Sequence, residues 1–221
     1  MNAAAAVPTA AWQLSAAMRA ASADEHDAAE ASPFLTELLG GDLGKEAYAA
    51  YLLRLRTVYA ALEEVVRCHR RDPLVAAVYD PALERLPAID ADLDYWSQES
   101  PRTVDSPAAE SYRCRLDSIN SGAALLVHHY TRYLGDLSGG QVIGRTLDRV
   151  FELGGVGLAL YSFPMRPKRY KDSYRSRLDS LTLQTEQVEI LLSEVKLAFR
   201  LNQALLDELG AQFAVSYSRD Q

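Results

Sequence analysis

The placement of proline is the feature that most limits how this chain can fold. Its nine prolines leave three long intervals, residues 34–72, 108–163 and 168–221, without the residue that breaks helix interiors. No interval shows the sustained apolar–polar alternation of a strand, and the nearest candidate, residues 156–163, is short enough to be a connection. The sequence therefore predicts an all-α fold.

The spacing of apolar residues predicts two long helices. Within residues 48–66, and again within residues 188–209, apolar side chains recur every three or four positions, as on the buried face of an amphipathic helix. Thr185 is the expected N-cap of the second helix and Gly210 its stop. Shorter helices are expected to begin at Ser32-Pro33 and Asp80-Pro81, and Gly40-Gly41 is expected to end the first of these.

Composition narrows the class of function. The 221 residues carry a formal net charge of −7, which disfavours a nucleic-acid or anionic-membrane partner. Two cysteines, Cys68 and Cys114, are too few for a disulfide framework or a thiolate metal site. No apolar stretch approaches the ~18 residues of a membrane span, and the alanine-rich start lacks the basic residues of a signal peptide. We therefore expect a soluble, cytoplasmic protein with no membrane anchor.

Glycines interrupt the middle interval. Gly135, Gly139, Gly140 and Gly144 fall in a segment whose other residues look helical, and each interior glycine costs about 1 kcal/mol relative to alanine. Their clustering predicts a kinked helix whose bare backbone another group can approach closely. Spacing alone leaves close helix packing as an equal alternative.

The block that contains these glycines, residues 130–141 with the sequence YTRYLGDLSGGQ, resembles the distal-helix signature of the heme oxygenases. The resemblance extends to the segments around His26 and to residues 59–64, 171–181 and 198–202. It implies a single-domain helical bundle over residues 9–210 with a glycine-kinked distal helix. Residues 1–8 would be a flexible N-terminus and residues 211–221 a polar C-terminal tail.

The same resemblance implies an activity. Heme b would be both cofactor and substrate, cleaved with O2 and external electrons to biliverdin, carbon monoxide and ferrous iron. The chain has no flavin or nucleotide motif, so the expected electron donor is a ferredoxin or a flavoprotein reductase.

His26 matches the family's proximal iron ligand. Without the resemblance it would be read as an ordinary surface or packing residue. Glu30 lies one turn further on the same helix face and is the expected partner of the second ring nitrogen, with solvated surface charge as its alternative. The adjacent His128 and His129 point about 100° apart on a helix and are expected to be structural.

On the distal side, the resemblance implies that Gly135 and Gly139 let the backbone lie over the heme face, with Gly140 also at the cofactor. Asp136 would hold the water that delivers a proton during the reaction. An ion pair with Arg132, four residues earlier, is its ordinary alternative, and the two roles are compatible.

A locally basic segment in this acidic chain, residues 166–177, includes Lys171 and Arg175. These two match the family's propionate-binding positions, as do Arg19 and Tyr130, and the alternative is a solvated helix face. Matches to pocket-lining positions also include Phe199, which packing would explain equally well, and Asn202, whose amide needs hydrogen-bond partners if buried.

The sequence departs from the family pattern at Asp24-Glu25, which puts two acids directly before His26. The main competing function is a heme-binding or delivery protein of the same fold that does not degrade heme. A diiron bundle needs Glu-x-x-His pairs, and no histidine here has glutamate three residues before it. Neither cysteine lies in a nucleophile motif.

Overall fold

The computed structural model describes residues 13–97 and 101–217, and within these ranges it contains helices and connections but no strand. The all-α prediction is confirmed. The elements are α1 (Leu14–Ala21), α2 (Ala23–Glu30), α3 (Pro33–Gly40), α4 (Lys45–Cys68), α5 (Pro73–Val78), the 3₁₀ helix η1 (Pro81–Leu83), α6 (Leu86–Trp96), α7 (Pro107–Asp117), α8 (Gly122–Gly135), the π-helical segment η2 (Asp136–Gly140), α9 (Gln141–Val150), the 3₁₀ helix η3 (Ala159–Tyr161), α10 (Pro167–Asp179) and α11 (Thr185–Tyr217).

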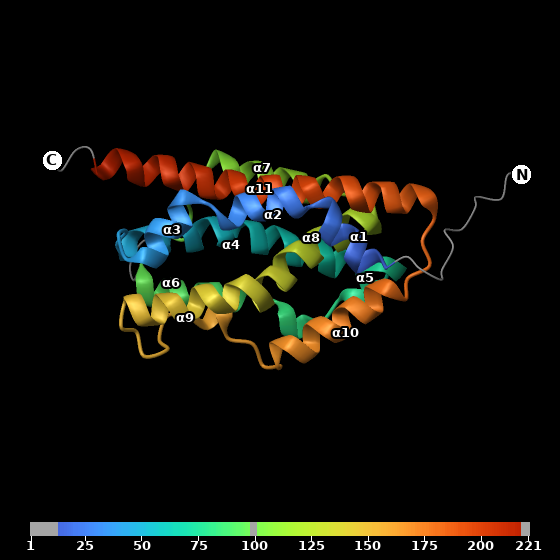
Figure 1. Cartoon of the computed structure of the whole chain (residues 1–221), viewed down its shortest axis with the longest axis horizontal. Helices are drawn as coiled ribbons and strands as arrows, with labels where there is room; N and C mark the ends of the chain where they lie inside the picture. The colour runs from blue at the N-terminus through green and yellow to red at the C-terminus, as the bar shows by residue number, and fades with distance from the viewer. Residues whose placement is uncertain (1–12, 98–100, 218–221) are drawn as a thin grey trace, which may run out of the picture.

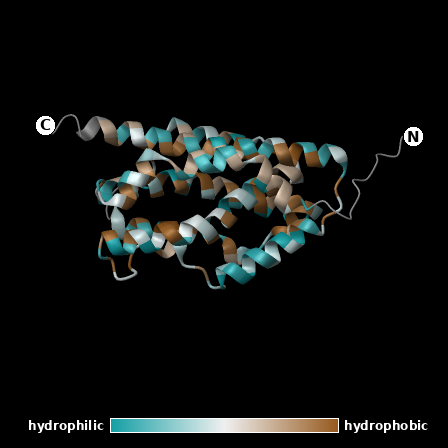
Figure 2. Ribbon diagram, viewed as in Figure 1, coloured by the Kyte–Doolittle hydropathy of each residue, from teal (hydrophilic) through white to brown (hydrophobic). Residues whose placement is uncertain are grey.

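The longest helix, α11, runs along one edge of the bundle in Figure 1, and α9 and α10 lie along the opposite edge. α11 packs against α8, α2 and α7, and α4 packs against α6 and α7. Apolar and polar residues alternate along most helices, whereas α10 is largely hydrophilic (Figure 2). The bundle therefore has an apolar interior and one strongly polar helix at its edge.

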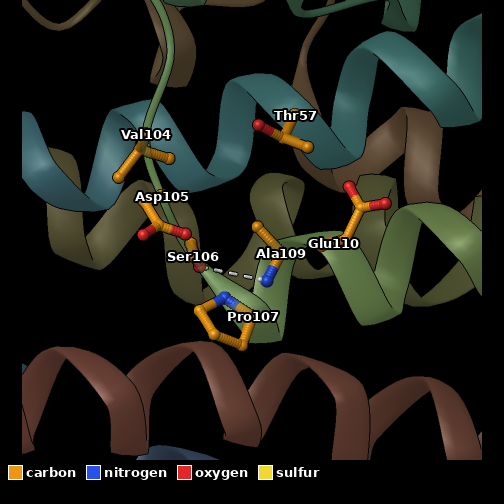
Figure 3. Close-up of a pocket in the computed structure, with 7 residues that line it drawn as sticks. All are labelled: Thr57, Val104, Asp105, Ser106, Pro107, Ala109 and Glu110. Atoms are coloured by element: carbon orange, nitrogen blue, oxygen red, sulfur yellow. Dashed lines mark hydrogen bonds between the residues drawn. The ribbon is translucent and has the colours of Figure 1, made fainter.

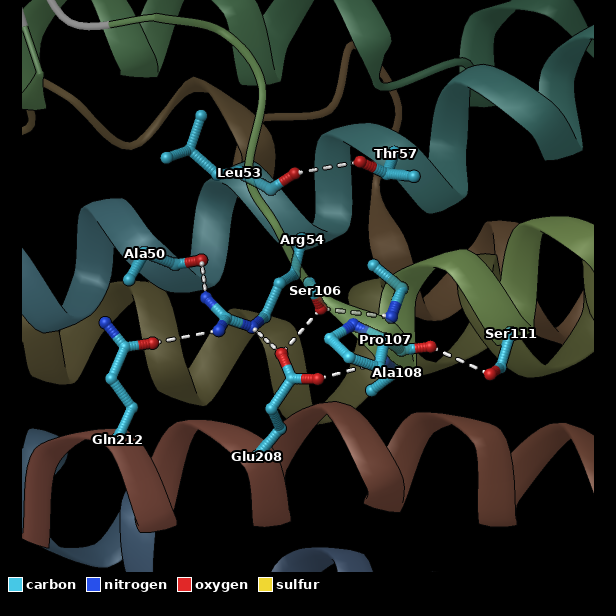
Figure 4. Close-up of polar contacts among 11 residues, drawn as sticks. Ala50, Leu53, Arg54, Thr57, Ser106, Pro107, Ala108, Ser111, Glu208 and Gln212 are labelled. Atoms are coloured by element: carbon cyan, nitrogen blue, oxygen red, sulfur yellow. Dashed lines mark hydrogen bonds and ion pairs between the residues drawn. The ribbon is translucent and has the colours of Figure 1, made fainter.

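The predicted stripe of the first long helix is the centre of the core. Leu52, Val58 and Leu62 of α4 are fully buried, and burying side chains of this size contributes roughly 1.5–3 kcal/mol each. α4 also carries Arg54, whose guanidinium donates through Nε to Glu208 of α11 at 2.8 Å. Figure 4 shows Glu208 also accepting hydrogen bonds from Ser106 and from the amide of Ala108, so one carboxylate joins α4, α7 and α11.

The end of α11 differs from the prediction. The helix continues through Gly210 to Tyr217, so residues 211–217 are helical and are not a tail. Phe213 lies 6.1 Å from the ring of Phe34 on α3, centroid to centroid, and this apolar contact favours continuation past the glycine. The expected N-terminal segment, residues 1–8, and the last four residues lie outside the described ranges.

The start of the chain also differs in detail. Residues 14–30 form two short helices, α1 and α2, that meet at Ser22, whose hydroxyl donates to the carbonyl of Met18 at 3.0 Å. Ser32 precedes α3 without a side-chain capping bond, whereas Asp80 caps the short η1 through the amide of Ala82. α3 ends as predicted, with Gly41 in the left-handed region at φ 87°.

The glycine block forms a local π-helical segment. α8 ends at Gly135, residues 136–140 form η2, and α9 continues from Gln141. A π-helical turn inserts an extra residue into the helical ladder, which bends the helix and often marks a functional site. The predicted kink is therefore present, and it begins at Asp136.

No helix among the described residues is long and apolar enough to cross a membrane.

Candidate functional site

Asp136 is a buried carboxylate at the start of the π-helical segment. The Tyr59 hydroxyl of α4 donates to its Oδ2 atom, and Arg132 Nη2 lies 3.8 Å from its Oδ1 atom. Burial raises the pKa of Asp136, while the Arg132 charge and the Tyr59 hydrogen bond act in the opposite direction. The sequence predicts Arg132 as a partner of Asp136 but does not reveal Tyr59, because only the folded chain brings α4 to this point.

Arg132 is the centre of a hydrogen-bonded group. Its Nε and Nη2 atoms donate to the Tyr59 hydroxyl at 3.3 and 3.2 Å, and Nη1 donates to Asn202 Oδ1 on α11. Asn202 is partly buried, and its amide oxygen has a hydrogen-bond partner in Arg132. The network fixes Arg132, Tyr59 and Asp136 relative to one another and to α11.

Four glycines of the kinked helix face two different surroundings. A Cβ atom built on Gly135 or Gly139 would meet no other atom within 4 Å. A Cβ on Gly140 would lie 3.3 Å from the ring of Tyr161, and one on Gly144 would lie 2.9 Å from it. Open space beside the backbone and close helix packing are therefore both present, at different glycines. Gly140, expected at the cofactor, borders Tyr161 on the side where a Cβ atom would lie.

His26 lies on α2 with its side chain 52% exposed. The edge of its ring meets Phe199 of α11, at 5.6 Å between centroids and 62° between planes. Nε2 is 3.6 Å from Glu30 and Nδ1 is 3.8 Å from Asp27. Each ring nitrogen thus has a carboxylate nearby, and either can bind a metal while the other keeps an acidic partner. Glu30 was expected here and Asp27 was not.

α11 connects the His26 side of this region to the Asp136 side. Phe199 and Asn202 are three residues apart and share a helix face. Phe199 contacts His26, and Asn202 accepts from Arg132. The structure therefore places Phe199 beside His26 and Asn202 beside Arg132.

The two acids before His26 do not both face its ring. Glu25 forms an ion pair of 3.1 Å with Arg200 of α11, which follows Phe199 in sequence. This ion pair, formed by one of the two acids that depart from the family pattern, joins α2 to α11 beside His26.

Positive charge gathers near Tyr130. Burial raises the pKa of Tyr130, and the charges of Arg175 on α10 and Arg19 on α1 act against that rise, so both cations lie close enough to influence the phenol. Lys171 donates from Nζ to the Ser138 hydroxyl at 2.8 Å. The basic helix α10 thus contacts both α8 and the π-helical segment.

His128 and His129, which are both buried, make structural contacts. His128 Nε2 is 2.7 Å from Glu194 of α11, and His129 Nδ1 is 2.8 Å from the Tyr174 hydroxyl. Burial lowers the pKa of His129 to about 3, which keeps it neutral. Within the described part of the chain, no group of three or more His, Cys, Asp or Glu residues is arranged to hold a metal ion.

Two surface hollows lie elsewhere. One, of about 440 Å³, is formed by Thr57 of α4 and the start of α7 (Figure 3), and the other, of about 770 Å³, extends along α4 and α7 past Cys68. No predicted site residue lines either hollow.

Comparison with known proteins decides what this arrangement is. The model of the family described as heme oxygenase matches residues 12–208. The chain belongs to the heme oxygenase family. It is 32% identical to a heme oxygenase of Rhodella violacea, over 89% of this chain and 86% of the relative, and 34% identical to heme oxygenase 1 of Rattus norvegicus, over 90% and 72%.

Solved heme oxygenases have the same fold. Heme oxygenase-2 of Synechocystis sp. PCC 6803, determined in complex with heme and NO, matches with a TM-score of 0.87 and 30% identity, over 93% of this chain and 88% of that one. The heme oxygenase of Leptospira interrogans matches with a TM-score of 0.84 and 32% identity, over 89% and 100%.

As a heme oxygenase, the chain degrades heme, which is both its cofactor and its substrate. Oxidative cleavage yields biliverdin, carbon monoxide and ferrous iron. The described residues fit such a group: an exposed imidazole is the ligand type that heme iron takes, and Gly135 and Gly139 leave open space where a flat ring can approach the backbone.

Proposed function

We propose that His26 holds the heme iron of this heme oxygenase from the proximal side. Glu30 or Asp27 would accept a hydrogen bond from the ring nitrogen that does not bind iron, which orients the imidazole and raises its basicity. Phe199 supports the ring from α11. The observation that carries the proposal is the exposed imidazole with a carboxylate near each nitrogen.

The distal side is assigned to the kinked helix. Bound heme supplies the redox-active iron and the porphyrin that is cleaved. Gly135 and Gly139 present bare backbone to the heme face, and Asp136 holds water that carries protons to the reacting centre. Arg132, Tyr59 and Asn202 fix the carboxylate in position, and the raised pKa of Asp136 suits a group that exchanges protons.

The heme propionates are assigned to the cationic group of Arg19, Lys171 and Arg175, with Tyr130 beside them. Carboxylates pair with ammonium and guanidinium groups through charge-assisted hydrogen bonds. Gly140, where a Cβ atom would face Tyr161, is assigned to the cofactor through its backbone.

The exposed bases of α10, such as Lys168 and Arg169, give an otherwise acidic chain a positive surface. An acidic electron donor, a ferredoxin or a flavoprotein reductase, would dock there through complementary charge, and O2 is the co-substrate. We place the reaction in the cytoplasm.

Turnover of hemin by Asp136→Ala tests the assignment of the distal residue. The variant should bind one hemin but give little biliverdin per hemin consumed, because the proton relay is lost. Asp207→Ala, an exposed acid on α11, is the matched control and should behave as the unmodified chain. A normal biliverdin yield from Asp136→Ala would remove Asp136 from the mechanism.

The same assay, run on the unmodified chain, tests the competing function of a heme-delivery protein. A heme-delivery protein would bind hemin through His26 and leave it intact when electrons and O2 are supplied.

A further inference from the structure

The three cations assigned to the propionates differ in how they are held. Lys171 donates to Ser138 Oγ at 2.8 Å, across the boundary between α10 and the π-helical segment. Arg175 pairs with Asp172 of its own helix at 3.6 Å. Arg19 has no hydrogen bond or ion pair within the described residues. Only Lys171 is tethered to the distal helix before any ligand arrives.

The hydrogen bond between Lys171 and Ser138, here called the tether, lies one residue before the open backbone of Gly139. Ser138 directly precedes Gly139, where a Cβ atom would meet nothing within 4 Å. The Lys171 ammonium is therefore held on the residue that adjoins this open backbone in sequence. An ammonium has three N–H donors, so two remain for a carboxylate while one stays on the Ser138 hydroxyl.

The tether is not required to dock α10. Three other contacts already hold this helix: Tyr174 with His129 at 2.8 Å, Tyr170 with Asp80 at 2.7 Å, and Asp179 with the Ser15 amide at 2.8 Å. Tyr174 and Leu178 are also fully buried. Loss of the hydrogen bond between Lys171 and Ser138 should therefore leave α10 docked.

We propose that Ser138 is a positioning residue that presets the Lys171 ammonium for one heme propionate; this inference rests on the proposed function. A free lysine side chain samples many rotamers, and ordering it on binding costs free energy. The hydroxyl orders the ammonium in advance, so that the propionate meets a donor already in place. Partial burial lowers the pKa of Lys171, and the Arg175 charge acts in the same direction, which adds to the need for a nearby acceptor.

Binding of two porphyrins by full-length variants tests the proposal. Dissociation constants are measured optically for hemin and for hemin dimethyl ester, which lacks the propionate charges. Ser138→Ala should weaken hemin binding about fivefold, the effect of one hydrogen bond, and leave ester binding unchanged. Ser138→Thr, which keeps the hydroxyl, should restore hemin binding. Ser176→Ala removes an exposed α10 hydroxyl that bonds only to its own helix and is the matched control.

A second background separates positioning from packing. In Lys171→Met, the further change Ser138→Ala should have no effect on hemin binding, because the group that it positions is gone. Equal loss for both porphyrins, or the same loss in the Lys171→Met background, would overturn the proposal in favour of a packing role. If the unmodified chain binds hemin no better than the ester, the propionate site itself fails and the proposal with it. If the preference for hemin exists but survives Ser138→Ala, only the role of Ser138 fails.

Discussion

Replacing Gly135 by alanine should stabilise the heme-free protein and damage its function. Gly135 has ordinary helical angles, φ −60° and ψ −51°, and an added Cβ atom would meet nothing within 4 Å. Alanine is favoured over glycine in a helix by up to about 1 kcal/mol, so the melting temperature should rise by roughly 2–4 °C for a chain of this size. The new methyl group would project into the space assigned to heme, so hemin binding and biliverdin yield should fall.

The assay pairs calorimetry of the heme-free protein with hemin titration and a measured biliverdin yield. Gly144→Ala is the comparison variant, because its Cβ atom would lie 2.9 Å from the Tyr161 ring. That overpacking should cost about 1–3 kcal/mol. A lower melting temperature for Gly135→Ala would show that the space is not open. Unchanged hemin affinity and biliverdin yield would show that it is not the heme face.

Three further predictions concern stability and ligation. Burial acts to raise the pKa of Glu194, but hydrogen bonds from His128 and Arg115 lower it from 4.5 to about 2, a difference of roughly 3 kcal/mol. Urea unfolding should therefore show Glu194→Gln less stable by up to that amount above pH 5, with the gap closing as the pH falls towards 2; a gap independent of pH would contradict this. Arg54→Met removes a buried partner 2.8 Å from Glu208 and should cost about 3 kcal/mol in denaturant unfolding, whereas a loss below about 1 kcal/mol would mean that the pair contributes little. His26→Ala should change the stability of the heme-free protein by less than about 0.5 kcal/mol, because the side chain is 52% exposed, yet abolish the ferric-heme signature of histidine ligation until imidazole is added; an unchanged spectrum would mean another ligand.

Local patterns in the sequence predicted much of the fold. The apolar stripe of α4 and the glycine cluster at the kink are properties of consecutive residues, so periodicity and composition revealed them. The end of α11 was predicted wrongly because Gly210 is a strong local stop signal, and the contact of Phe213 with Phe34 that opposes it exists only after folding.

The candidate site was predicted from family motifs, and its supporting contacts were not. Tyr59 lies in an apolar stripe and reads as core, although its hydroxyl reaches Asp136. Glu25 was noticed as an unusual acid, but its partner Arg200 is 175 residues away in sequence. The tether between Ser138 and Lys171 likewise joins two helices. Such pairs depend on which helix faces meet, which a single sequence does not specify.

We propose that this chain binds heme through His26 and cleaves it at the kinked helix. The most direct measurement adds one equivalent of hemin to the purified protein under air with catalase and a reducing system, and follows the visible spectrum. We expect the Soret band to disappear while biliverdin absorption grows. A stable complex that never degrades would contradict the assigned distal site, and no Soret shift on adding hemin would contradict the assigned ligand.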